Sequence, residues 1–231
     1  MKNIKLEICV GNINDIIKTK DLNIDRYELN SALELGGLTP TLNTLIKAKE
    51  VTDIPIMCMT RVRGGGFIYS QDEIDVMLKD AETMIKYGAD GIVFGFLNDE
   101  LEIDIPNTKK MREITKGKTL VFHKAFDYVL DQEKAIKELI EIGIDRILLM
   151  GSGDILDCAK NISKLNQKYG DKIELLPGGG INKDNIIDVL NITNVSQIHG
   201  TFKDFSKDIS TNEKIIINSY EKIQEIIKLI K

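Results

Sequence analysis

Short apolar runs alternate with longer amphipathic segments along almost the whole chain. The short runs are rich in β-branched and aromatic residues and are bounded by polar or glycine-containing turns, as is typical of buried strands. The longer segments carry apolar residues three and four positions apart, which indicates helices with one buried face. The pattern predicts eight strands, over residues 5–10, 25–30, 55–61, 91–95, 119–126, 146–150, 173–178 and 196–200.

Eight helices are expected to accompany these strands. The clearest amphipathic segments cover residues 41–51, 72–88 and 132–143, and the last helix is predicted over 212–231. Dividing 231 residues by eight gives about 29 per unit, close to the size of one strand and its crossover helix. The pattern therefore predicts a single α/β domain over residues 1–231, folded as a (β/α)₈ TIM-type barrel. An open doubly wound sheet is the alternative, but the first turn, VGNIND, lacks the glycine-rich pattern of that fold.

Alternate residues of each strand face the lumen of such a barrel, and the carboxyl ends of the strands carry the site. In the first strand Leu6, Ile8 and Val10 share the helix-facing side. The same parity puts Met57 and Met59 in the lumen and Lys124 on the outside. The lumen is therefore expected to contain Glu7, Cys9, Arg26, Glu28, Arg61, His123 and His199.

Burying that many charged groups is costly unless they pair with one another or bind a ligand. One interpretation is an ion-pair network that fills the barrel, with two structural histidines. For the group as a whole, a ligand site at the carboxyl ends of the strands is the favoured interpretation.

Two glycine-rich segments indicate anion binding. PGGGINKDN, residues 177–185, follows the seventh strand, the region that binds phosphate in many barrels. Its backbone amides and a helix start suit an anion. RVRGGGFIYS, residues 61–70, combines two arginines with glycines. It is expected to be a mobile anion-binding lid, or else an exposed loop with solvated arginines.

Composition narrows the function classes. The net charge is −5, which argues against an electrostatic grip on nucleic acid or on an anionic membrane. The chain shows no membrane-spanning apolar run and no signal-peptide core. Its three cysteines, Cys9, Cys58 and Cys158, are too few and scattered for a disulfide framework. A cytoplasmic globular protein is expected.

Several segments in order resemble the CutC family of copper homeostasis proteins, over about residues 4–200. The matching segments are LEICV (6–10), DRYELN (25–30), GGLTPT (36–41), RVRGGGFIYS (61–70), GADGIVFG (88–95), FHKAFD (122–127), DRILLMGSG (145–153), PGGG (177–180) and IHG (198–200). The resemblance implies a TIM-type barrel, a cytoplasmic location and a dimer or higher homo-oligomer. It also implies Cu(I) binding by Cys9. Where the family carries a second cysteine this chain has Asn30, a poor ligand for Cu(I), and Lys124 stands where the family usually has arginine.

Three functions are compatible with these residues. The first is copper binding by Cys9, with the Met57 and Met59 thioethers and with His123 or His199 as the imidazole. The second is an enzyme acting on a small phosphorylated or anionic metabolite, in which Glu7, Glu28 and His123 are the candidate acids and bases. The third is a scaffold without a ligand.

The enzyme hypothesis has its own binding residues and one obstacle. The residues expected to bind the metabolite are Arg61, Arg63, Asp127, Gly178, Gly179, Gly180 and His199. The strand parity leaves the lumen without a lysine, so an imine-forming mechanism lacks a nucleophile.

Overall fold

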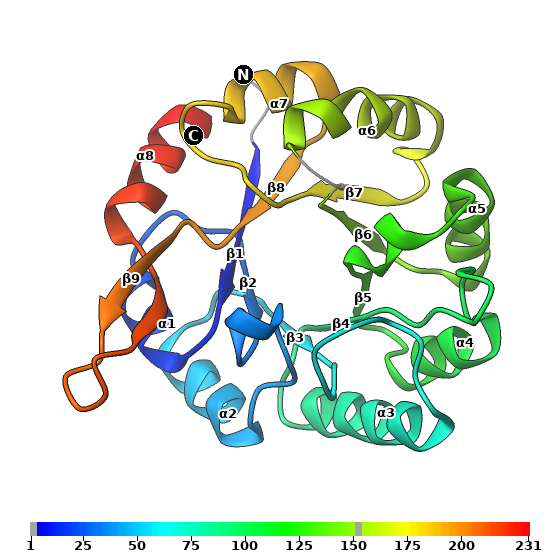
Figure 1. Ribbon diagram of the computed structural model, residues 1–231, viewed down its shortest axis with the longest axis horizontal. Helices are drawn as coiled ribbons and strands as arrows, with labels where there is room; N and C mark the ends of the chain where they lie inside the picture. The colour runs from blue at the N-terminus through cyan, green and yellow to red at the C-terminus, as the bar shows by residue number, and fades with distance from the viewer. Residues whose placement is uncertain (1–3, 151–153) are drawn as a thin grey trace.

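The computed structural model describes residues 4–150 and 154–231, and the end of the DRILLMGSG segment, 151–153, lies outside it. Eight parallel strands form the central sheet, in the order β7-β6-β5-β4-β3-β2-β1-β8. Because β7 and β8 at the two ends of this order contact each other, the sheet closes into a ring (Figure 1). The strands are β1 (Lys5–Val10), β2 (Arg26–Leu29), β3 (Ile56–Met59), β4 (Gly91–Phe94), β5 (Thr119–Phe122), β6 (Arg146–Leu149), β7 (Glu174–Pro177) and β8 (Gln197–Gly200).

Helices surround this ring and complete the (β/α)₈ barrel that the sequence predicts (Figure 1). Side-chain caps define most of their starts; Ser70, for example, forms a reciprocal capping box with Glu73. None of the helices in the described part of the chain is long and apolar enough to cross a membrane. The α-helices are α1 (Ile13–Thr19), α2 (Leu42–Val51), α3 (Gln71–Lys86), α4 (Ile105–Ile114), α5 (Gln132–Ile142), α6 (Ile155–Tyr169), α7 (Ile186–Thr193) and α8 (Tyr220–Ile230).

The apolar side chains form two separate cores, one on each face of the sheet. The larger core lies between strands and helices and includes Leu6, Ile8 and Cys58. The smaller core fills the lumen, with Met57 and Met59 in contact with Val93, Val121, Leu148 and Leu176. The strand parity read from the sequence is therefore confirmed for these residues.

The fifth strand ends earlier than predicted, and this changes the position of Lys124. The strand stops at Phe122, and residues Lys124–Tyr128 form a 3₁₀ helix. His123 causes the turn, since its Nδ1 atom accepts a hydrogen bond from the amide of Ala125 and its carbonyl accepts one from Phe126. The prediction of a strand to residue 126, with Lys124 outside the barrel, was wrong.

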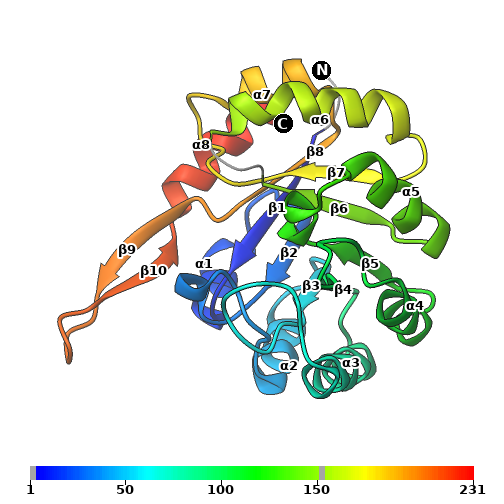
Figure 2. The same cartoon turned by 45° about the vertical axis from the view of Figure 1, so that its right-hand side comes forward.

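The C-terminal helix predicted over residues 212–231 is also wrong at its start. Helix α8 begins at Tyr220, after the cap Ser219. The preceding residues form β10 (Lys214–Asn218), which pairs antiparallel with β9 (Lys203–Lys207). This hairpin, which the sequence analysis did not foresee, projects away from the ring (Figure 2). Three consecutive isoleucines, 215–217, explain the strand because β-branched side chains favour extended backbone.

Gly91 provides a test of the packing inside the barrel. A Cβ atom at this position would lie 2.5 Å from Met57 Sδ and 2.5 Å from the carbonyl oxygen of Thr119. Because the oxygen belongs to the neighbouring strand, the clash cannot be relieved by a side-chain rotation. Gly91→Ala should lower the free energy of unfolding by about 1–3 kcal/mol, measured by urea denaturation. The control Gly66→Ala, with nothing within 4 Å of the added Cβ, should unfold within ~0.5 kcal/mol of the parent; equal effects would contradict this account.

Candidate metal and ligand site

A buried ion-pair network lies in the lumen around Glu7. The carboxylate accepts a hydrogen bond from Arg26 Nε at 2.8 Å and contacts His199 Nδ1 at 2.9 Å. Arg146 lies 3.8 Å away, and Arg26 also donates to Gln197. Adjacent strands supply these groups, because Glu7 of β1 is in register with both Arg26 of β2 and His199 of β8. The network therefore fixes the orientation of the His199 imidazole.

The charges in this network are mutually stabilising. Burial by itself would raise the pKa of Glu7, but the hydrogen bond with His199 and the charges of Arg26 and Arg146 hold it well below its usual value. Burial opposes a charge on His199 as well. The carboxylates of Glu28 and Glu7 outweigh that effect and raise the pKa of His199 well above its usual value. Glu7 is therefore an anion and His199 a cation at neutral pH.

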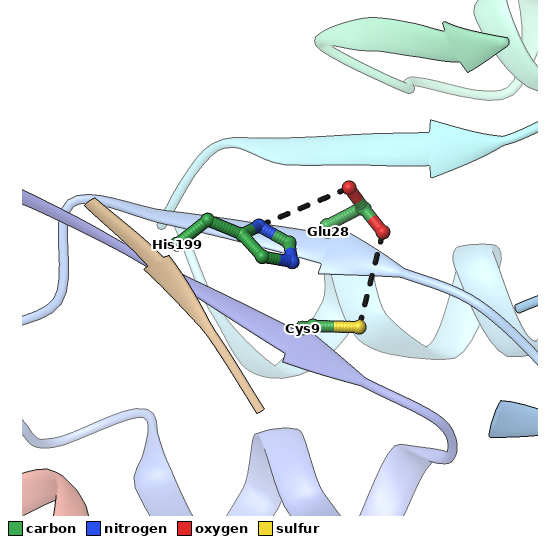
Figure 3. Close-up of side chains that lie close together, drawn as sticks. All are labelled: Cys9, Glu28 and His199. Carbon is green, nitrogen blue, oxygen red and sulfur yellow. Dashed lines mark hydrogen bonds and ion pairs between the residues drawn. The ribbon is translucent and has the colours of Figure 1, made fainter. Parts of the chain in front are cut away.

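Cys9, Glu28 and His199 come together next to Glu7, on the side of the carboxyl ends of the strands. One potential ligand atom from each lies within 4.8 Å of the other two (Figure 3). Cys9 Sγ lies 3.8 Å from Glu28 Oε1, and His199 Nδ1 lies 3.9 Å from Glu28 Oε2. Glu28 Oε2 is buried and has no hydrogen-bond partner among the described residues. The cluster therefore offers a thiol, an imidazole and an uncommitted carboxylate oxygen.

Asn30 fixes the arrangement of this cluster. Its amide nitrogen donates to Glu28 Oε1 at 2.8 Å and to Cys9 Sγ at 3.4 Å. Burial and then the negative charge of Glu28 raise the pKa of the Cys9 thiol. Burial also raises the pKa of Glu28, with His199 opposing the shift and Glu7 adding to it. Asn30 thus supports the two side chains in place of the cysteine that the family resemblance implies there.

A cavity of about 150 Å³ opens above the cluster. Two thioethers, Met59 and Met150, line it, together with two cationic side chains, Lys124 and Lys203. A second cavity, of about 860 Å³, shares His199, Met150 and Lys203 with the first and extends towards α7 and α8. The full lining of the smaller cavity is Cys9, Glu28, Asn30, Leu33, Gly36, Gly37, Met59, His123, Lys124, Leu148, Met150, His199, Thr201, Lys203 and Ile216.

His123 is a neutral side chain in the wall of the smaller cavity. Burial, followed by the charges of Arg61 and Lys124, lowers the pKa of His123 to about 3. Because its Nδ1 atom accepts the amide hydrogen of Ala125, the proton of the neutral ring resides on Nε2. Nε2 is buried and has no hydrogen-bond partner among the described residues.

The two arginines of the RVRGGGFIYS segment do not line either cavity. Arg61 is buried and donates to the carbonyl oxygens of Leu35, Gly36, Gly37 and Gly65. Arg63 lies at the surface, paired with Glu73 at 2.5 Å and stacked over Tyr69. Arg61 therefore joins two loops, whereas Arg63 joins its own loop to α3 and is not brought to the site.

The other predicted ligand-binding residues lie around the cavities. Asp127 Oδ2 accepts the amide hydrogen of Met150, which ties the 3₁₀ helix to the end of β6. A Cβ at Gly178 would lie 3.0 Å from the His199 ring, so this glycine makes room for the imidazole. Gly179 and Gly180 have φ angles of 76° and 74° and line the larger cavity.

Sequence reasoning missed several residues of this site, among them Met150, which lines both cavities. Arg146 shares the parity of Leu148 and Met150, so the strand pattern was sufficient to place it in the lumen. Lys124 was assigned to the wrong face because the turn at His123 was not recognised. Lys203 belongs to the unforeseen hairpin.

Comparisons with known proteins agree with this architecture. The CutC family profile matches residues 4–204. The chain belongs to the CutC family. A CutC family protein of Treponema denticola is 43% identical over 200 residues, 86% of this chain and 81% of the relative. The human protein named copper homeostasis protein cutC homolog is 34% identical over 195 residues, 84% of this chain and 71% of the relative.

A solved structure of a CutC protein, from Streptococcus agalactiae, superposes with a TM-score of 0.82 at 33% sequence identity. The superposition covers 86% of this chain and 98% of the other. The family match of this chain includes Cys9, Glu28 and His199, whereas β10 and α8 lie beyond its end at residue 204.

Glu7→Gln tests the importance of the buried network for stability. The substitution removes the direct anionic partner of Arg26 and His199, while Arg146 keeps Glu174 and His199 keeps the more distant Glu28. Because Arg26 is then left buried without an anion, the free energy of unfolding at pH 7 should fall by about 3–5 kcal/mol. A carboxyl with a lowered folded-state pKa stabilises the fold fully above its unfolded-state pKa of about 4.3 and progressively less below it. The difference between parent and variant should therefore shrink as the pH falls below about 4.

Urea denaturation at several pH values measures this difference. Exposed Glu82 provides the matched control, since Glu82→Gln changes the same group at the surface of α3. A Glu7→Gln protein as stable as the Glu82→Gln protein at pH 7 would show that the network contributes no net stability.

Proposed function

We propose that this chain binds a copper ion through Cys9 and His199, with Glu28 as a third ligand, and so acts in copper homeostasis. The observation that carries the proposal is the approach of the three ligand atoms to within 4.8 Å of one another beside a cavity. Copper homeostasis is the role named for the human relative.

The donor set suits copper. Cu(I) prefers thiolate and thioether sulfur, and imidazole is a good copper ligand in either oxidation state. The Cys9 thiol supplies the first donor, and the thioethers of Met59 and Met150 line the same cavity. Met57 belongs to the same lumen core as Met59 but does not line the cavity. Copper, when bound, would replace the protons that the thiol and the imidazolium now carry.

His199 rather than His123 is the proposed imidazole ligand. The Glu7 carboxylate contacts His199 Nδ1, which leaves Nε2 as the atom available to a metal. A carboxylate behind a histidine ligand fixes the ring and increases its basicity, as in many metal sites. His123 uses Nδ1 for the turn that ends β5. Asn30 would orient Cys9 and Glu28 without binding the ion.

A cytoplasmic location and a homo-oligomer are also part of the proposal. All three cysteines of the chain are free thiols, as expected in a reducing compartment. The oligomer rests on the family resemblance alone and stays a prediction, to be checked by light scattering.

Cys9→Ser tests the copper site directly. Loss of the only thiol in the cluster should weaken Cu(I) binding by at least about 100-fold, measured by competition with a Cu(I) chelator under reducing conditions. Cys158→Ser is the matched control, because Cys158 lies on α6, away from both cavities, and its Cu(I) affinity should equal that of the parent. An unchanged affinity in a folded Cys9→Ser protein would overturn the site.

A second candidate function is the binding or conversion of a small anionic metabolite, such as a phosphorylated one. The backbone amides of Gly179, Gly180 and Ile181 favour it. None of the three donates to another described residue, and all three residues line the cavity of about 860 Å³. Backbone amides on a glycine turn are a common anion-binding arrangement. Glu28 and His123, the candidate acid and base, line the adjoining smaller cavity, which shares His199 with the larger one.

Inorganic phosphate tests this candidate in copper-free protein. A ligand present at 100 times its dissociation constant stabilises the fold by about 2.7 kcal/mol, which raises the melting temperature by roughly 5–10 °C in a domain of this size. Sodium chloride at equal ionic strength is the control. A melting temperature that rises equally in both salts would count against an anion site at the glycine turn.

A further inference from the structure

Lys124 brings an amine to the smaller cavity, next to the cluster but outside the proposed copper ligands. The turn at His123 directs the side chain over the carboxyl end of the barrel, where it lines the cavity with Cys9, Glu28 and His199. Its Nζ atom lies beside Gly36, so close that a Cβ there would be 2.7 Å away. A Cβ at position 36 would have to displace the flexible end of this lysine, and the φ angle of Gly36, 84°, independently favours glycine.

The surroundings of Lys124 make its ammonium group easier to deprotonate than that of an ordinary lysine. Burial and then the positive charge of Arg61 lower the pKa of Lys124, and the negative charges of Glu28, Cys9 and Asp127 oppose the shift without cancelling it. Arg61 is held in position by four backbone carbonyls, so it cannot move away. Desolvation and a fixed neighbouring cation are the usual means by which a lysine becomes a nucleophile near neutral pH.

Two further groups in the same cavity wall complete a reactive set. His123 carries a proton on Nε2, is completely buried and has no hydrogen-bond partner for that proton among the described residues. Glu28 Oε2 is likewise buried and uncommitted. His123 can donate a hydrogen bond to a carbonyl oxygen without carrying a charge. Glu28 can act as the acid or base when a carbonyl compound loses or regains water.

We propose that Lys124 forms an imine with a small aldehyde or ketone bound in the cavity beside Glu28 and His123. The nucleophile, Lys124, is not one of the proposed copper ligands, but Glu28 serves both proposals, so the reaction is assigned to the copper-free protein. The cavity, at about 150 Å³, is smaller than the roughly 300–1,000 Å³ of pockets for drug-sized ligands. The carbonyl compound therefore has only a few carbon atoms.

The reaction balances without an oxidant or a metal. The neutral amine of Lys124 adds to the carbonyl carbon, and the carbonyl oxygen takes up a proton to give a carbinolamine. Loss of the nitrogen proton and departure of the hydroxyl group as water then form the C=N bond. Glu28 carries the proton to the departing hydroxyl, while the Nε2–H of His123 holds the oxygen in both steps.

Reductive trapping tests the proposal. Copper-free protein, prepared with a chelator, is incubated at pH 7 with glyoxylate or with glycolaldehyde and cyanoborohydride, which reduces an imine to a stable secondary amine. Peptide mass spectrometry then gives the labelling rate of each lysine. Lys124 should react faster than exposed Lys47, because a lowered pKa increases the fraction of neutral amine, by about tenfold for each unit. Using both probes shows whether a negative charge on the carbonyl compound matters.

Two variants separate the proposed reaction from general lysine modification. Lys124→Arg keeps the positive charge but cannot form an imine, and should abolish the fast labelling with its melting temperature little changed. Lys47→Arg, at a solvent-exposed position on α2 paired with Glu50, should leave the fast labelling intact. Labelling of Lys124 no faster than that of Lys47, or undiminished fast labelling in Lys124→Arg, would overturn the proposal. Neither outcome bears on copper binding, which the Cys9→Ser measurement decides independently.

Discussion

The buried carboxylate of Glu7 is the interaction on which the rest of the lumen depends. A single anion there is shared by Arg26, Arg146 and His199, each from a different strand. An isolated charge at this depth would cost several kcal/mol. Glu7 therefore depends on these three cations, and Arg146 is also held by Glu174 of β7. Because the set spans β1, β2, β6 and β8, it also determines how these strands face one another across the barrel. The orientation of His199, and with it the cluster above, follows from that constraint.

Most polar atoms around Glu7 have hydrogen-bond partners, Arg146 Nη1 being an exception, whereas two groups nearer the carboxyl ends of the strands have unpaired atoms that line a cavity. In the layer around Glu7, Arg26 and His199 have short, direct partners. Nearer the carboxyl ends of the strands, Glu28 Oε2 and His123 Nε2 are buried without hydrogen-bond partners among the described residues. Native proteins seldom leave buried polar atoms unpaired, because each costs about 1–3 kcal/mol. Such a cost is retained where a ligand restores the missing interaction, which is why the two proposals both place their chemistry at this level of the barrel.

Much of this arrangement follows from periodicity alone. The alternation of Leu6, Glu7, Ile8 and Cys9 places two polar groups in the lumen because neighbouring residues of a strand face opposite sides of a sheet. The same rule fails at Lys124, since a hydrogen bond between His123 and Ala125 ends the strand and no local pattern shows it. Arg61 shows another limit. Its parity suggests a lumen position, but its final partners are carbonyl oxygens of two loops, whose positions depend on the folded barrel.

The cavity beside the cluster is lined partly by the barrel and partly by the hairpin of β9 and β10. The cluster of Cys9, Glu28 and His199 lies on β1, β2 and β8, within the region that matches the CutC family. Ile216 on β10 contributes to the cavity wall from beyond that region. The residues of the cluster, which form the floor of the cavity, and the hairpin residues Lys203 and Ile216 at its edge therefore belong to segments under different structural constraints. The residues of the floor lie on strands of the closed barrel. The hairpin forms a separate two-stranded sheet, so it can change in length or sequence without disturbing the pairing of the barrel strands. Relatives that share the same cluster can accordingly admit different molecules to it.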